Sequence, residues 1–191
     1  MPYQYSHKGI HDLQRRIALY EDESAYRELF FLLFDPLTRF ATSIVQSKET
    51  AEEIVSDVFI QLWKKRADIE QIDDLKLYIY ISVKNLSVKK YKQQLKRKTV
   101  SIDMLELNMP SADQDPEKAL FFSETYVRIQ QAIEQLPGRA RLIFRLAKEH
   151  RMRYKEIADL LHISVKTVDN QLAIAVKKIA SVIQFRSSQK K

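Results

Sequence analysis

Apolar side chains recur every three or four residues along most of the chain. Between Ser47 and Arg66 they form a single stripe opposite a polar face. The stripe consists of Ala51, Ile54, Val55, Val58 and Leu62. The same periodicity returns at about 10–20, 22–45, 75–92, 116–136, 138–149, 154–161 and 165–185. Because apolar positions at i, i+3, i+4 and i+7 are typical of amphipathic α-helices, we expect an all-α chain.

Residues that cap helices stand where several of these stretches begin. Asp22 and Ser47 precede two of them, and Asp73 or Asp74 precedes the stretch that ends near Lys92. Their side-chain oxygens can accept hydrogen bonds from the free N–H groups of a first helical turn. These residues therefore predict where three helices begin.

Prolines mark interruptions in the pattern. Asp35-Pro36 indicates a kink, or a new helix start with proline in its first turn. Asp115-Pro116 indicates a further helix start, and Pro137-Gly138 a helix end.

The stretch from Thr99 to Gln114 has little periodicity, contains Pro110 and is acidic. We expect a flexible linker at 96–115 between two small helical bundles, at 8–95 and 116–186.

Composition excludes several classes of protein. The chain has 191 residues, two glycines and no cysteine. A G-x-G-x-x-G motif or a P-loop is therefore absent, and an all-β fold rich in tight hairpins is disfavoured. The absence of cysteine excludes disulfides, a thiol nucleophile and a cysteine zinc site. No run of 18 apolar residues and no apolar core of signal-peptide length near the start is present, so we expect no membrane insertion and a cytoplasmic location.

The net charge of +7 is unevenly distributed. Residues 1–83 carry −4, residues 84–98 carry +7, residues 99–137 carry −5 and residues 138–191 carry +9. Two basic blocks separated by an acidic one suggest two contacts with a polyanion and a connector between them. A solvated, lysine-rich surface is the alternative explanation.

Residues 154–172 have the spacing of a helix-turn-helix motif. The positions that such a motif buries are Ile157, Ala158, Leu161, Ile163, Val168 and Leu172. Ser164 can cap the second helix, whose first residues would then face base edges in the DNA major groove. The candidates for that contact are Val165, Lys166, Thr167, Asp169, Asn170 and Gln171.

Lys166 and Lys177 suit contacts with phosphates. A helical hairpin that only packs is the alternative. The turn has His162 where such motifs often have glycine. A left-handed conformation costs a non-glycine residue about 1 kcal/mol, although histidine adopts it more readily than most residues.

Residues 75–92 interleave aromatic rings with lysines. Tyr78, Tyr80 and Tyr91 offer ring faces for unstacked bases. The lysines are Lys84, Lys89, Lys90 and Lys92. This combination suits single-stranded or partly melted DNA, since rings stack on bases and cations attract phosphates. Burial of Tyr78 in the core is the alternative.

Four segments follow one another in a characteristic order. They are 57–63, 77–85, 136–144 and the helix-turn-helix at 154–172. In this order and spacing, over about 20–185, the chain resembles RNA polymerase sigma factors of the sigma-70 family. It is most similar to the extracytoplasmic-function (ECF) group, which retains only regions 2 and 4 of the family.

The resemblance implies that region 2, at 8–95, binds core RNA polymerase and recognises and melts the −10 promoter element. The helix over 48–66 would contact the β′ clamp. Its contact residues would be Glu53, Asp57, Phe59, Ile60, Gln61 and Lys64. Core packing is the alternative for Phe59 and for Trp63. Segment 66–74 would receive a flipped −10 base. The helix after it would contact DNA through Tyr80, Lys84, Asn85, Lys89 and Tyr91.

Region 4, at 116–186, would recognise the −35 element through 165–177 and dock on the β flap through 120–150. The acidic linker would run toward the RNA exit path, where its charge could mimic RNA. The implied partners are core RNA polymerase, promoter DNA and an anti-sigma factor. The resemblance implies no cofactor, no metal and no enzymatic activity.

Two other classes of function remain open from the sequence. One is a conventional dimeric helix-turn-helix regulator that does not bind the polymerase. The other is a hydrolase or metalloenzyme, for which the chain offers four histidines: His7, His11, His150 and His162. No glutamate lies between the first two, so an H-E-x-x-H motif is absent. We therefore expect solvated surface histidines.

Overall fold

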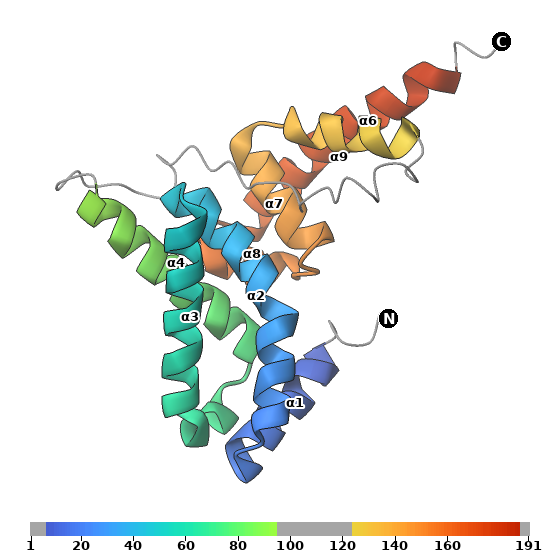
Figure 1. The fold of residues 1–191 in the computed structure, drawn as a ribbon. Coiled ribbons are helices and arrows are strands. Elements are labelled where there is room, and N and C mark those ends of the chain that lie inside the picture. The colour runs from blue at the N-terminus through green and yellow to red at the C-terminus, as the bar shows by residue number, and fades with distance from the viewer. Residues whose placement is uncertain (1–6, 95–123, 188–191) are drawn as a thin grey trace. The chain divides into compact units, whose positions relative to one another are not determined.

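A computed structural model describes residues 7–94 and 124–187 of the chain. Every regular element in these ranges is a helix and none is a strand, which confirms the predicted all-α class (Figure 1). The chain divides into two compact units, Met1–Leu105 and Glu106–Lys191. The predicted linker at 96–115 and the helix start at Asp115-Pro116 lie outside the described residues.

Within its described residues, the first unit contains four α-helices and one 3₁₀ helix. They are α1 (His7–Tyr20), α2 (Glu23–Val45), α3 (Lys48–Lys64), η1 (Arg66–Gln71) and α4 (Leu75–Gln94). The apolar stripe of α3 is buried, as predicted. It packs against α2 and α4, while α1 lies against α2 and η1. Helices α2 and α4 each contact the other three α-helices of this unit within its described residues.

Local capping explains where the helices of the first unit begin. The Ser47 hydroxyl accepts a hydrogen bond from the Thr50 N–H at 3.1 Å, which caps α3. Of the two candidates before α4, Asp74 is the cap, since its carboxylate accepts from the Leu77 N–H at 2.9 Å. Each bond satisfies a backbone donor that has no partner inside its own helix.

The predicted helix start at Asp35-Pro36 is wrong, because α2 continues through Pro36. A proline inside a helix removes one backbone hydrogen bond and costs about 3 kcal/mol. Burial compensates for this loss, since Leu33, Leu37 and Phe40 on either side of the proline are almost completely buried.

Asp22 caps α2 and carries the clearest pH dependence of the fold. Its carboxylate accepts hydrogen bonds from the N–H groups of Ser24 and Ala25 and from the Arg16 guanidinium. The Ala25 N–H above all, then Arg16, lower the pKa of Asp22 from 3.8 to about 2. Because the folded pKa lies below the unfolded one, this carboxylate stabilises the fold above pH 3.8, and that stabilisation is lost as the pH falls toward 2.

We therefore expect Asp22→Asn to change the acid sensitivity of the first unit. Asparagine can still cap the helix but does not titrate. Between about pH 4 and pH 2 the melting temperature of the variant should fall less than that of the wild type. Fluorescence of Trp63, the single tryptophan of the chain, measures this unit selectively. Parallel falls in the two proteins would contradict this role of Asp22.

Left-handed backbone conformations occur here without glycine. Among the described residues, Glu21, Gln46, Arg151 and His162 have positive φ angles and no glycine does. His162 has φ 54° and ψ 48°, as expected for the turn of the predicted helix-turn-helix. Each such residue costs about 1 kcal/mol, so these turns depend on the packing of the helices that they join.

The second unit consists of α6 (Glu124–Glu134), α7 (Gly138–Lys148), α8 (Tyr154–Leu161) and α9 (Val165–Ser187) within the described residues. Helix α9 contacts the other three helices and is therefore the centre of this unit. One cluster of its core joins Ile133 and Leu136, from and just after α6, to Ala175 of α9.

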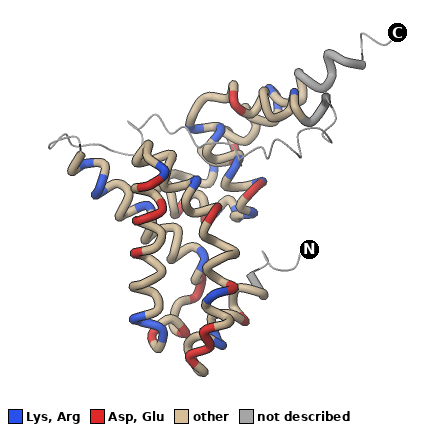
Figure 2. Tube along the Cα trace, in the orientation of Figure 1, with Lys and Arg blue, Asp and Glu red and all other residues tan. Residues whose placement is uncertain are grey.

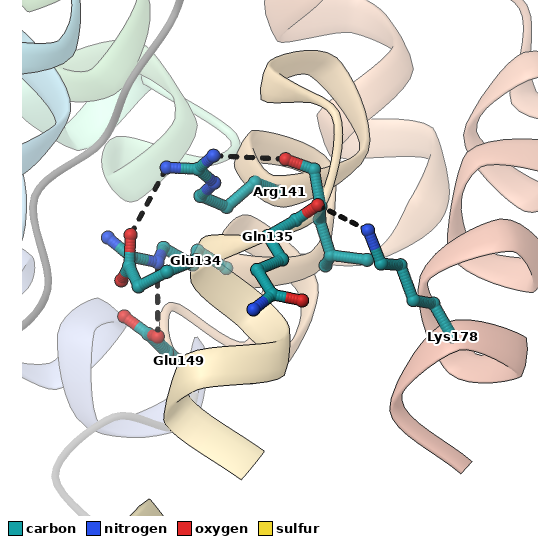
Figure 3. Close-up of polar contacts among 7 residues, drawn as sticks. Glu134, Gln135, Arg141, Glu149 and Lys178 are labelled. Atoms are coloured by element: carbon teal, nitrogen blue, oxygen red, sulfur yellow. Dashed lines mark hydrogen bonds and ion pairs between the residues drawn. The ribbon is translucent and has the colours of Figure 1, made fainter. Parts of the chain in front are cut away.

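A polar network ties α6 to α7 (Figure 3). The side chain of Arg145 is completely buried, and it donates a short hydrogen bond to Glu134. Its Nε atom lies 3.6 Å from a carboxylate oxygen of Glu149. Arg141 binds the second Glu134 oxygen at 3.1 Å. Two arginines of α7 thus converge on one glutamate at the end of α6.

Candidate functional site

The helix-turn-helix of the second unit has the geometry that its sequence predicts. Ile157, Leu161 and Val168 are buried between α8 and α9. The Ile163 N–H donates to the Ala158 carbonyl at 3.0 Å, which closes the turn. At the start of α9, the Ser164 hydroxyl accepts from the Thr167 N–H at 3.0 Å.

One face of α9 is left open. Lys166, Asn170, Ala173 and Lys177 are all exposed and follow the i, i+4, i+7, i+11 spacing of a single helix face. This face begins in the first turn of α9. On this face, Lys166 and Lys177 therefore lie on either side of Asn170. The Asn170 amide can both donate and accept hydrogen bonds at a base edge. Ala173 was not among the predicted contacts, although the same spacing could have identified it.

The other predicted contacts of α9 differ in exposure. Val165 and Asp169 are exposed. Thr167 and Gln171 are half-buried, and the Thr167 hydroxyl lies 2.8 Å from that of Ser164. Thr167 therefore helps to hold the start of the helix.

Two of the predicted DNA contacts on α4 are corrected by the structure. Tyr80 is fully buried, and its ring lies 5.5 Å from the ring of Phe40, so it has no face available for a base. Lys84 is only 3 % exposed, and burial lowers the pKa of its amine. Asn85 and Lys89 are exposed and Tyr91 is half-buried. Figure 2 shows lysines along the last turns of α4.

The exposed tyrosine of this helix is Tyr78, which is 42 % exposed. It lines a groove of about 300 Å³ between α3, η1 and α4. The groove is lined by Val58, Gln61, Leu62, Lys65, Asp68, Ile69, Ile72, Tyr78, Ser82 and Leu86. Apolar side chains with a few polar groups and one ring at the wall can hold a planar ligand of the size of a base.

The polar face of α3 carries most of the predicted polymerase contacts. Glu53, Asp57, Ile60, Gln61 and Lys64 are exposed. Acidic residues of the first half of this helix, among them Glu53 and Asp57, also line a shallow surface depression.

Phe59 is corrected from a polymerase contact to a core residue. It is 1 % exposed, and its ring packs edge-on against Phe30 at 5.0 Å. Ile60, one residue further along the helix, is 49 % exposed. Trp63 is half-buried, and its ring lies 4.8 Å from that of Tyr26 in a tilted arrangement. The Arg66 guanidinium lies 4.9 Å from the Trp63 ring.

The histidines are not all at the surface. His11 and His162 are exposed, as expected, but His150 is 4 % exposed, which corrects that expectation. His150 lies just after the last turn of α7, where Arg145 and Leu146 are buried as well. The His7 side chain lies outside the described side chains. No group of three or more metal-ligating side chains occurs within the described part of the chain.

None of the described helices is both long and apolar enough to cross a membrane.

Family comparisons assign both units. Residues 33–97 match the model of sigma-70 region 2, and residues 126–179 match that of sigma-70 region 4. No curated protein sequence matches the chain. Among solved structures, the chain resembles the sigma factor RpoE of Bartonella quintana, crystallised in complex with the anti-sigma factor NepR. The TM-score is 0.52 at 17 % identity, over 83 % of this chain and 96 % of that one.

The chain therefore belongs to the sigma-70 family of RNA polymerase sigma factors. Its function is that of a sigma factor in transcription initiation.

Proposed function

We propose that the chain binds core RNA polymerase through α3 and directs it to promoters by contacts of α9 with the −35 element and of the α3–η1–α4 groove with the −10 element. The observation that carries this proposal is the open face of α9 in a complete helix-turn-helix, with Asn170 between Lys166 and Lys177. The amide suits base edges and the lysines suit phosphates.

The −10 contact rests on the groove and on the helix beside it. A flipped base would enter next to Tyr78, while the exposed Asn85 and Lys89 of α4 would contact the strand outside. The energy of unstacking is then compensated by new contacts with the base. The protein acts in this way by binding alone, without a chemical step, and in the cytoplasm, where the polymerase and the promoter are.

The polymerase contact rests on the exposed polar face of α3. Since Phe59 is buried, Ile60 is the apolar residue that this face offers among charged neighbours. The β′ clamp would bind here, and the second unit would contact the β flap. An anti-sigma factor would hold the free protein, as the fold likeness to RpoE in its complex suggests.

Reversing the charge of Asp57 is expected to weaken polymerase binding. Asp57 is exposed, so Asp57→Arg should leave the melting temperature unchanged while lowering the affinity for core polymerase about tenfold through like-charge contacts at the interface. Titration of fluorescently labelled protein with core polymerase measures this. Glu28→Arg is the matched control, because Glu28 is exposed on α2. Equal affinities for the two variants would argue against α3 as the docking face.

Size-exclusion chromatography with core polymerase separates the proposed function from that of a conventional regulator. A sigma factor comigrates with the polymerase and directs transcription. A dimeric helix-turn-helix regulator elutes alone, at the size of a dimer, and binds a two-fold symmetric DNA site. Elution apart from the polymerase would overturn the proposal.

A further inference from the structure

A buried glutamine of the first helix holds the wall of the groove. Gln14 of α1 is 3 % exposed. Its Nε2 atom donates hydrogen bonds to the carbonyl of Ile69 at 2.6 Å and to that of Ile72 at 2.8 Å. These two contacts span 55 and 58 residues of sequence, so they fix η1 against a helix from the start of the chain.

The chemistry of this contact requires an amide. A side-chain NH₂ group has two donor hydrogens, and each reaches one carbonyl here. Ile72 is the residue that directly follows η1, so its carbonyl has no partner inside that helix. A carboxylate at position 14 would place its oxygens against the two carbonyl oxygens, which are acceptors as well. An apolar side chain would remove both donors, although the Ile69 carbonyl would keep its hydrogen bond from the Ile72 N–H at 3.1 Å.

The same backbone carries the side chains that line the groove. Asp68, Ile69 and Ile72 all belong to its wall. Gln14 therefore supports from behind the segment whose side chains face the groove. A second contact from the same end of the chain supports the start of η1, where Arg66 binds the Glu21 carboxylate at 2.9 Å.

We infer that Gln14 is a positioning residue for base selection in the groove, and that α1 is part of the −10 recognition apparatus. This inference rests on the proposed function of the groove. Helix α1 precedes the residues that match region 2, which begin at position 33. The two hydrogen bonds set the position of the backbone at 69–72, and so determine which base the wall accepts.

Transcription from a promoter library randomised over the −10 element tests this inference. Holoenzymes reconstituted with wild-type protein, Gln14→Glu or Gln14→Met are compared by sequencing the transcribed templates. We expect both variants to flatten the base preference at one −10 position about tenfold, which corresponds to about 1.4 kcal/mol of discrimination. The other promoter positions and the affinity for core polymerase should be unchanged.

Controls separate positioning from general stability. Val55→Ala removes buried methyl groups from α3 about three turns away from η1, so it destabilises the unit without touching Gln14's partners. It should lower total transcription and keep the base preference. An unchanged preference in Gln14→Met, or the same flattening in Val55→Ala, would overturn the inference. If Gln14→Glu does not fold, Gln14→Met decides, since methionine keeps the length of the side chain. Failure of the proposed function gives a different result, because the wild type itself would then select no promoter.

Discussion

Replacing Glu134 with alanine is expected to destabilise the second unit by about 3 kcal/mol while leaving the first unit unchanged. The carboxylate of Glu134 forms ion pairs with Arg145 and Arg141. The side chain of Arg145 is completely buried, and that of Arg141 is largely buried. Removing one partner of a buried ion pair leaves a charge in the core with less compensation, which costs 3–5 kcal/mol in general. We take the lower end because Glu134 itself is 38 % exposed.

Two optical signals distinguish the units in this experiment. The only tryptophan, Trp63, lies in the first unit, so its fluorescence follows the unfolding of that unit in urea. Far-ultraviolet circular dichroism follows all helices. In Glu134→Ala we expect part of the dichroism transition to shift to lower urea while the fluorescence transition stays in place. Gln135→Ala is the matched control, since the substitution keeps both backbone contacts of this residue: its N–H donates to the Gln131 carbonyl at 3.1 Å and its carbonyl accepts from Lys178 at 2.6 Å. An unchanged dichroism transition would show that the network contributes little.

Replacing Asn170 with alanine is expected to remove base discrimination at one position of the −35 element. Asn170 lies on the open face of α9, and a bidentate amide contact favours adenine over the other bases. Its loss should cost about 2 kcal/mol of discrimination, or about 30-fold, at that position. Sequencing of transcripts from a library randomised over the −35 element measures this.

Lys166→Ala supplies the contrasting variant on the same face. A phosphate contact carries no base information, so its loss should lower the affinity for all templates alike. It should also reduce the slope of the logarithm of the binding constant against the logarithm of the salt concentration by about one. Ser181→Ala, which is exposed about three turns further along α9, should change neither property. If Asn170→Ala instead weakened all templates equally, the amide would be a backbone contact rather than a base contact.

The features that the sequence predicts well are those set by local chemistry. These features depend on residues within a few turns of one another. They are the apolar stripe of α3, the helix caps at Asp22 and Ser47, and the helix-turn-helix. The left-handed conformation of His162 also follows from its position in the turn, where such motifs often have glycine.

The errors concern contacts between distant segments. Tyr80 and Phe59 were assigned to interfaces, but they are buried by Phe40 and Phe30, which come from α2. Helix α4 packs against α1, α2 and α3, so its apolar positions surround more of the helix than one stripe, and periodicity does not separate Tyr78 from Tyr80. The burial of Lys84 has the same origin.

Gln14 shows a related difficulty. A polar residue in an amphipathic helix gives no sign that its partners are two carbonyls more than 50 residues away. Its burial and its hydrogen bonds are visible only in the structure. The groove likewise depends on how three elements meet, so the sequence predicts the segment at 66–74 but not the residues that surround it.

In the proposed function, two separate parts of this chain recognise two promoter elements for one polymerase. Transcription by the reconstituted holoenzyme from a library randomised over both elements tests it most directly. We expect the wild type to select two short motifs at a fixed spacing. Asn170→Ala should alter only the upstream motif, and Gln14→Met only the downstream one. Selection of no template, or of a single two-fold symmetric motif, would overturn the proposed function.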